Sequence, residues 1–136
     1  MTNELNIEAL PDKMQDVLDF VDEHLEKMGA SMKVQMQLDV AVEEVFVNIA
    51  HYAYTPDTGN AIIHVDEDNE NNQIYITFTD TGKPYNPLAR PDPDVTLSAE
   101  ERQIGGLGIF MVKKSMDDVR YEYKDGCNIL TITKKL

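Results

Sequence analysis

The sequence has little of what marks secreted or membrane-spanning proteins. Its 136 residues contain a single cysteine, Cys127, which excludes an internal disulfide and is compatible with the reducing cytoplasm. No apolar run approaches the ~18 residues of a membrane span. The first residues, Met1 to Glu4, include no basic segment followed by an apolar one, so no signal peptide is visible. We therefore expect a cytoplasmic protein that does not associate with a membrane.

Basic residues are also scarce. Lysine and arginine number 12 against 25 aspartates and glutamates, which gives a formal net charge of −13. A nucleic-acid surface needs clustered Lys and Arg to displace counterions, so we expect no direct contact with nucleic acid. The acidic excess favours solubility. It also means that a phosphate site in this chain must rely on backbone N–H groups, a helix N-terminus and a bound cation.

The length fits one domain, residues 1–136. Apolar residues at helical spacing predict helices from Pro11 to Gly29 and from Ser31 to Tyr52. Period-two alternation and turn residues predict strands at 5–10, 60–65, 73–79, 119–123 and 127–133. This order predicts an α+β two-layer sandwich, with helices packed on one face of a mixed, mostly antiparallel sheet.

The helix from Ser31 to Tyr52 carries a polar stripe. On a helical wheel, Asn48 and His51 lie within about 40° of Glu44. Apolar side chains border this stripe on both sides: Leu38, Val42, Val45 and Ile49 on the core side, Val40 and Val47 on the other. Because apolar residues lie on both sides of the polar stripe, we expect the stripe to face a cavity and not bulk solvent. His51 itself is more often a structural hydrogen-bonding residue than a ligand.

Glu44 and Asn48 have a chemical use in such a position. They are four residues apart, so their side chains lie roughly 6 Å apart at the base. Mg²⁺ accepts an amide oxygen together with phosphate oxygens and waters, and a carboxylate one turn away can accept a proton from an attacking hydroxyl. Asp39 and Glu43, on the same helix, are expected to point toward solvent. The alternative is a boundary helix whose polar side chains simply meet water.

Two glycine-containing segments follow. Asp80-Thr81-Gly82 ends a strand. Because Asp and Gly are common in turns, a tight turn without a ligand explains this segment as well as a binding site does. Gly105-Gly106-Leu107-Gly108 precedes a helix that we expect to begin at Gly108 or Ile109, where free N–H groups can receive phosphates. This second segment lacks the Lys and Ser/Thr of a Walker A loop and the preceding buried strand of a dinucleotide-binding fingerprint. Between the two, residues 85–104 form a Pro-rich, acidic stretch whose length is typical of functional or disordered loops.

The order of these motifs resembles one superfamily. E-x-x-x-N on a helix, D-x-G after a strand, a variable loop and G-G-L-G opening a helix resemble the ATP-binding fold of gyrases, heat-shock chaperones and sensor histidine kinases. Within it, residues 42–51 and 105–112 resemble the bacterial anti-sigma-factor serine/threonine protein kinases. The resemblance implies ATP and Mg²⁺ as cofactors, and phosphoryl transfer to a small antagonist protein. It also implies a sigma factor as second partner and a homodimer as a common assembly.

The resemblance further implies a role for each site residue. Glu44 would be the general base, and Asn48 the Mg²⁺ ligand. Asp80 would accept a hydrogen bond from the adenine amino group, and Gly82 would let the backbone lie against the ring. The phosphates would be bound by Gly105, Gly106, Leu107, Gly108 and Arg102, and residues 85–104 would form a lid over the nucleotide.

Two departures from the family pattern leave alternatives open. Pro84 stands where the usual D-x-G-x-G motif has its second glycine, so the loop is stiffer and one backbone donor is lost. Arg102 stands two residues further from the Gly-Leu-Gly than the family's phosphate-contacting arginine. The main alternative is a binding module in which the nucleotide arranges a partner surface without phosphoryl transfer. A histidine-kinase-like phosphotransfer component is disfavoured, because no helical segment bears a phospho-accepting histidine.

Overall fold

Five strands form one sheet in the computed structural model, which describes residues 3–89 and 106–136. The strands are Glu4–Glu8 (β1), Asn60–Asp68 (β2), Gln73–Asp80 (β3), Asp118–Lys124 (β4) and Cys127–Lys135 (β5). They are ordered β1-β2-β3-β5-β4, and each pair is antiparallel. Along β3 every second residue is buried, from Ile74 to Asp80, which is the alternation that predicted this strand. One face of the sheet is therefore built to be covered.

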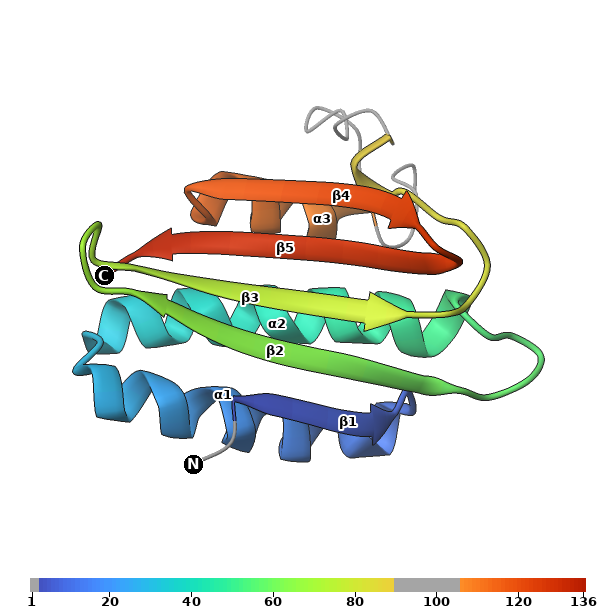
Figure 1. The fold of residues 1–136 in the computed structure, drawn as a ribbon, viewed down its shortest axis with the longest axis horizontal. Coiled ribbons are helices and arrows are strands. Elements are labelled where there is room, and N and C mark those ends of the chain that lie inside the picture. The colour runs from blue at the N-terminus through green and yellow to red at the C-terminus, as the bar shows by residue number, and fades with distance from the viewer. Residues whose placement is uncertain (1–2, 90–105) are drawn as a thin grey trace.

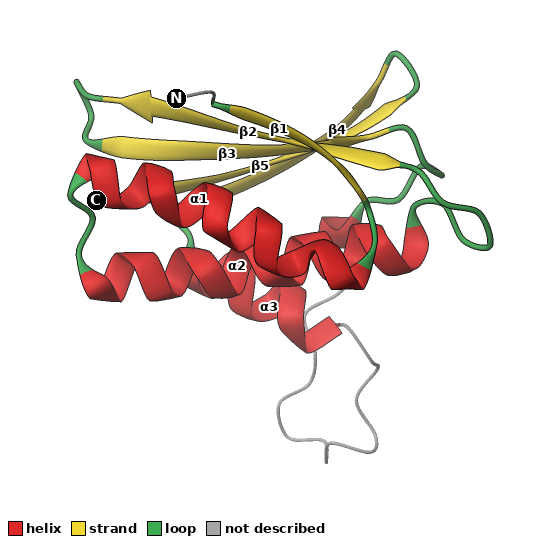
Figure 2. Ribbon diagram, turned by 90° about the horizontal axis from the view of Figure 1, so that it is seen from below, coloured by secondary structure: helices red, strands yellow, loops and turns green. Residues whose placement is uncertain are grey.

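Three α-helices within the described residues cover that face (Figures 1 and 2). They are Met14–Met28 (α1), Met32–Tyr52 (α2) and Gly106–Ser115 (α3), with short 3-10 helices at Pro11–Lys13 and Pro87–Ala89. The predicted two-layer sandwich is thus confirmed. All strand pairs that the structure describes are antiparallel, so the mixed component of the predicted sheet is not seen among them. None of the described helices is long and apolar enough to cross a membrane.

The first two helices end and begin where the sequence predicts. Gly29 follows α1 in the left-handed conformation, with φ 72°, and its N–H donates to Glu26 O, as is typical of a helix C-terminus. Ser31 then caps α2, since its hydroxyl accepts a hydrogen bond from the Val34 N–H at 3.2 Å. The short connection makes α1 and α2 antiparallel neighbours.

The hydrophobic core lies between this helix pair and the sheet. Its largest fully buried side chains come from both layers: Leu25, Leu38, Phe46, Ile63, Ile74, Ile76, Phe78 and Ile132. Burial of each such side chain contributes about 1.5–3 kcal/mol before the entropy of ordering is subtracted. The core fixes α2 across the sheet, so that its C-terminal end lies at the same end of the molecule as the end of β3 (Figure 1).

The third helix begins earlier than the sequence analysis predicted. We expected it to start at Gly108 or Ile109, but it starts at Gly106. The glycines therefore form the first turn itself, which is the part of a helix whose N–H groups have no acceptor within the helix. Glycine has no side chain to shield these N–H groups, although it lowers the stability of a helix relative to alanine.

Candidate functional site

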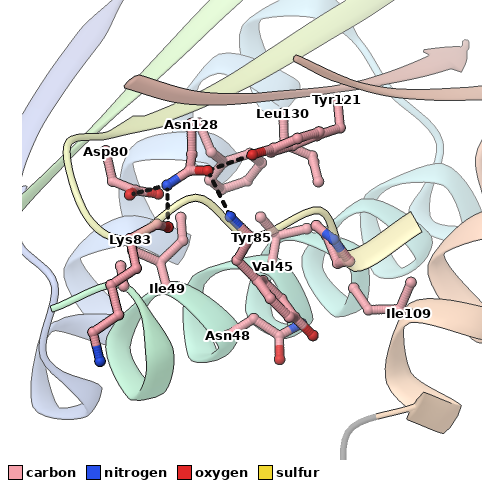
Figure 3. A pocket seen from close by; sticks show the side chains of 13 residues that line it. Val45, Asn48, Ile49, Asp80, Lys83, Tyr85, Ile109, Tyr121, Asn128 and Leu130 are labelled. Carbon is pink, nitrogen blue, oxygen red and sulfur yellow. Dashed lines mark hydrogen bonds between the residues drawn. The ribbon is translucent and has the colours of Figure 1, made fainter. Parts of the chain in front are cut away.

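A pocket opens between the C-terminal half of α2, the ends of β3 and β5, and the start of α3 (Figure 3). The space that it outlines is about 440 Å³, a volume that includes open solvent at its mouth. Its walls are mainly apolar, and its few polar groups are the side chains of Asn48, Asp80, Lys83 and Asn128 and the hydroxyls of Tyr85 and Tyr121. A flat apolar ring with a few hydrogen-bonding groups at one edge fits such a pocket.

Asp80 lies at the inner end of this pocket, and its side chain is only 5% exposed. Its Oδ1 accepts two hydrogen bonds at 2.9 Å, one from the Gly82 N–H and one from Asn128 Nδ2. The second oxygen, Oδ2, accepts none from the described residues. Because the carboxylate is held in place through one oxygen, the other is oriented and available as an acceptor for a ligand.

Asn128 is the site residue that sequence reasoning missed. Besides holding Asp80, its Nδ2 donates to the Lys83 carbonyl at 2.8 Å, while its Oδ1 accepts from the Tyr85 N–H at 3.1 Å and from the Tyr121 hydroxyl. One buried amide thus ties β4, β5 and the loop after β3 together (Figure 3). The sequence indicates this role only indirectly: Asn128 alternates with the buried residues Leu130 and Ile132 along β5. A polar side chain at such a buried position needs hydrogen-bond partners.

Gly82 allows the loop after β3 to approach the end of α2. A Cβ at this position would lie 2.6 Å from the carbonyl carbon of Ala53, far inside any contact distance for a side chain. The next residue, Lys83, donates its N–H to Ala53 O at 2.8 Å. The glycine of the D-x-G motif is therefore required by the packing of the loop against α2, and its contact with a ring remains a prediction.

The Glu44 carboxylate lies against the first turn of α3. A Cβ at Gly108 would lie 2.6 Å from Glu44 Cδ and closer still to one carboxylate oxygen, so a larger residue there would displace the Glu44 carboxylate. Partial burial, with a smaller effect of the Glu43 charge, raises the pKa of Glu44 above its ordinary value. The α2 glutamate and Gly108, 64 residues apart in sequence, are thus neighbours in the structure.

Asn48, one turn further along α2, lines the pocket. Its Nδ2 is buried, and no described residue accepts a hydrogen bond from it. Buried amides in proteins are rarely left without a partner, and rotation of the amide by 180° would present Oδ1 in the same place. Asn48 therefore offers an unused polar group between Glu44 and Asp80, where a ligand can supply the partner.

The outer border of the α2 stripe differs from expectation. Val40 is 54% exposed, so it does not enclose a cavity. Asp39 does not point freely to solvent, because its Oδ1 is buried beside Asp22 of α1, whereas Glu43 is exposed as predicted. The helical wheel gives the directions of the α2 side chains correctly, but it cannot show that α1 packs against the side of α2 that carries Asp39.

Other predicted site residues are only partly placed. His51 is exposed and does not line the pocket. Gly106 and Leu107 belong to the first turn of α3, but Gly105, Arg102 and most of the expected lid lie outside the described residues. The first part of that segment is described: Tyr85 is hydrogen-bonded to Asn128, and Pro87 is buried in the pocket wall. Pro84 lies between the two residues that Asn128 holds, and it is exposed.

Comparison with known proteins gives a consistent picture. Serine/threonine-protein kinase BtrW of Bordetella bronchiseptica is 28% identical over 103 residues, covering 76% of this chain and 72% of that protein. Serine-protein kinase RsbW of Listeria innocua is 27% identical over 111 residues, covering 76% and 68%. The structure of the RsbU and RsbW domains of Rv1364c from Mycobacterium tuberculosis superposes on 99% of this chain with a TM-score of 0.70.

The last of these likenesses concerns the fold alone, since the sequence identity is 17% and the chain spans 33% of that polypeptide. The family assignment comes from the sequence itself. The model of the histidine kinase-like ATPase domain family matches residues 7–134, which is nearly the whole chain and includes every motif described above. The chain belongs to the histidine kinase-like ATPase domain family.

Proposed function

We propose that this protein is an ATP-dependent serine/threonine protein kinase that phosphorylates a small antagonist protein and also binds a sigma factor. The observation that carries the proposal is the order of Asp80, Asn48 and Glu44 from the inner end of the pocket to the first turn of α3. A bound ATP needs, in that order, a group that binds its adenine, a group that binds Mg²⁺ beside its phosphates, and a carboxylate that accepts the proton of the attacking hydroxyl. The BtrW and RsbW relatives carry the names of serine or serine/threonine protein kinases, which supports the reaction class.

Adenine fits the inner end of the pocket. Apolar side chains such as Ile49 and Phe78 would contact the ring faces, and Asp80 Oδ2 would accept a hydrogen bond from the exocyclic amino group. Asn128 cannot replace Asp80 in this role, because its only acceptor, Oδ1, is already engaged with the Tyr85 N–H and the Tyr121 hydroxyl. Guanine carries a carbonyl oxygen where adenine has its amino group. Its binding would therefore bring two hydrogen-bond acceptors, this oxygen and Asp80 Oδ2, face to face.

The residues around Asn48 fit a bound Mg²⁺. Its Nδ2 has no hydrogen-bond partner among the described residues, and the oxygen of the same amide is a suitable ligand for this cation. The triphosphate would extend from the pocket to the N–H groups of Gly106, Leu107 and Gly108 in the first turn of α3. With a net charge of −13, the chain needs such a cation, which supplies the charge neutralisation for phosphoryl transfer.

Glu44 would act as the general base. The oxygen of a serine or threonine hydroxyl attacks the γ-phosphorus, its proton passes to the Glu44 carboxylate, and the bond to the β-phosphate oxygen breaks to release ADP. The contact between Glu44 and Gly108 supports this role, because the phosphates are proposed to bind at the first turn of α3. Its raised pKa, caused mainly by burial, makes it a stronger base than an exposed glutamate.

A binding module without phosphoryl transfer is the second candidate, and Pro84 favours it. The loop around Pro84 is held through Lys83 and Tyr85 by Asn128, so its conformation does not need a nucleotide. In this alternative ATP would bind in the same pocket and arrange a partner surface only. The proposed cytoplasmic location, sigma-factor binding and homodimerisation apply equally to both candidates.

One experiment separates the two candidates. The protein is incubated with γ-labelled ATP, Mg²⁺ and each small protein encoded beside its gene, and ATP binding is measured in parallel. Label on a serine or threonine of one such protein supports the kinase. ATP binding without transfer to any of them selects the binding module, and absence of ATP binding contradicts both.

A further inference from the structure

An apolar stripe runs along the exposed face of α2. Met32, Met36 and Val40 are 75%, 61% and 54% exposed, although the same helix buries Leu38, Ala41, Val42, Val45, Phe46 and Ile49 on its other side. A spacing of four residues places the three side chains above one another on one face, over a length of about 12 Å. Contiguous exposed apolar groups on a helix that already has a core face indicate an interaction surface.

Uncompensated negative charge borders this stripe. Asp39 follows Met36 by three residues, and its carboxyl lies beside that of Asp22 on α1. Oδ1 of each carboxyl is buried, and no N–H or hydroxyl group of the described residues donates a hydrogen bond to it. No ion pair between described residues involves either aspartate, and the exposed Glu43 adds a third negative charge one turn beyond Asp39.

The acidic border has a measurable electrostatic consequence. Burial, together with the hydrogen bond and the charge of Asp22 and the charge of Glu43, raises the pKa of Asp39 to about 7. The isolated chain thus relieves the repulsion by taking up a proton. A cation placed beside Asp22 and Asp39 would relieve it without a proton.

We propose that this α2 surface, defined by Met32, Met36 and Val40 with Asp22, Asp39 and Glu43 at its border, docks an amphipathic helix of another protein. That helix presents apolar side chains one turn apart to the methionines and a lysine or arginine to Asp39. Methionine suits such a surface, because its flexible side chain adapts to apolar partners of different shapes. Charge complementarity supplies the specificity.

A second copy of this chain does not have the required chemistry. A symmetric pairing of this surface would place the same acidic border of one copy near that of the other, in a chain whose net charge is already −13. Like charges brought together in this way oppose association. The occupant that fits both the stripe and its border is therefore a basic amphipathic helix of a different protein.

The surface is separate from the nucleotide pocket. Its three apolar residues belong to the N-terminal half of α2, whereas Val45, Asn48, Ile49 and Ala53 of the C-terminal half line the pocket. Docking is therefore expected without nucleotide, and the proposal does not depend on the kinase assignment. The test is accordingly made on the full chain in the absence of ATP.

The probe is a fluorescent synthetic helix of 18 residues with leucines at every fourth position and lysines beside them. Its binding is followed by anisotropy, and its footprint by amide chemical shifts of the labelled protein. We expect the shifts to map to α2 around residues 32–40, and a peptide with glutamates in place of the lysines to bind at least about tenfold more weakly. A peptide of the same composition with permuted leucines is expected to bind more weakly as well.

Two variants and two matched controls locate the interaction. Met36→Gln is expected to weaken binding at least about fivefold. Asp39→Asn is expected to weaken it about threefold or more and to reduce its salt dependence. Tyr123→Gln and Glu122→Gln alter an exposed apolar and an exposed acidic residue on β4, and they should leave the affinity within about twofold.

Three results would overturn the proposal. The first is an affinity that neither Met36→Gln nor Asp39→Asn changes. The second is a chemical-shift footprint on the sheet face or in the pocket instead of α2. The third is self-association of the free chain that Met36→Gln abolishes, measured by sedimentation, since this would make a second copy the occupant.

Discussion

Asn128 stands directly opposite Asp80 on the neighbouring strand, and its Nδ2 lies 2.9 Å from Asp80 Oδ1. The same amide holds the backbone at Lys83 and Tyr85. The adenine-binding carboxylate proposed above is thus oriented by a residue 48 positions later in the chain. This dependence leads to the first prediction.

Asn128→Ala should destabilise the fold and weaken nucleotide binding together. Removal of the amide takes one of two hydrogen bonds from the buried Asp80 carboxylate and removes the acceptor that the Tyr85 N–H and the Tyr121 hydroxyl share, which costs roughly 1–3 kcal/mol. Urea denaturation measures the loss of stability, and titration with ATP the loss of affinity. Thr131→Ala, on the same strand but on the opposite face of the sheet, serves as the control. Equal behaviour of the two variants would show that Asn128 has no special role.

Asp80→Asn should weaken adenine nucleotides in particular. The amide can turn its NH₂ toward the adenine amino group, so that two donors face each other at a buried site, a mismatch of roughly 1–3 kcal/mol. The measurement is competition between ATP and GTP for the wild-type and variant proteins. A preference for ATP that stays unchanged in the variant contradicts the assignment of Asp80 to the base.

Gly108→Ala should show the contact between α3 and Glu44 directly. The new Cβ overlaps the Glu44 carboxylate, and forced overpacking typically costs about 1–3 kcal/mol. In a Glu44→Ala background the same substitution should cost at least about 1 kcal/mol less, because the clash has been removed. A double-mutant cycle on the free energy of unfolding measures this difference. Additive effects would mean that the two residues do not touch.

Asp39 should make stability depend on pH. Its pKa in the folded state is raised to about 7 from 3.8, so its contribution to stability is fully present below about pH 4 and is lost as pH rises through 7. Asp39→Asn stays neutral and avoids this loss. We therefore expect the free energy of unfolding of Asp39→Asn, relative to wild type, to be higher at pH 8 than at pH 5. Asp118→Asn, in an exposed pair with Arg120, should show no such rise.

The parts that the sequence predicts well depend on local patterns. Periodicity and the turn residues placed α1, α2 and the strands, because Gly29 and Ser31 act within a few residues of the helix ends that they define. The motif order likewise predicted Glu44, Asn48 and Asp80 as members of one site; Asn48 and Asp80 line one pocket and Glu44 contacts the first turn of α3, while their roles stay predictions. The family match over residues 7–134 agrees with that order.

The parts that sequence reasoning missed depend on packing between distant segments. The role of Asn128 follows from strand register across β3 and β5, which no local pattern specifies. The exposure of Val40 and the burial of Asp39 depend on which side of α2 is covered by α1. A helical wheel gives the direction of a side chain but not the identity of what lies there.

Single-turnover phosphoryl transfer by Glu44→Gln tests the central claim most directly. The amide fills the same volume as the carboxylate but accepts no proton, so ATP affinity should stay within a few-fold of wild type. The rate of transfer from γ-labelled ATP to the serine or threonine of the small partner should fall by about 10²–10⁴, the usual loss when a general base is removed. Equal rates for the two proteins, with ATP bound equally well, would contradict the assignment of Glu44 as the catalytic base.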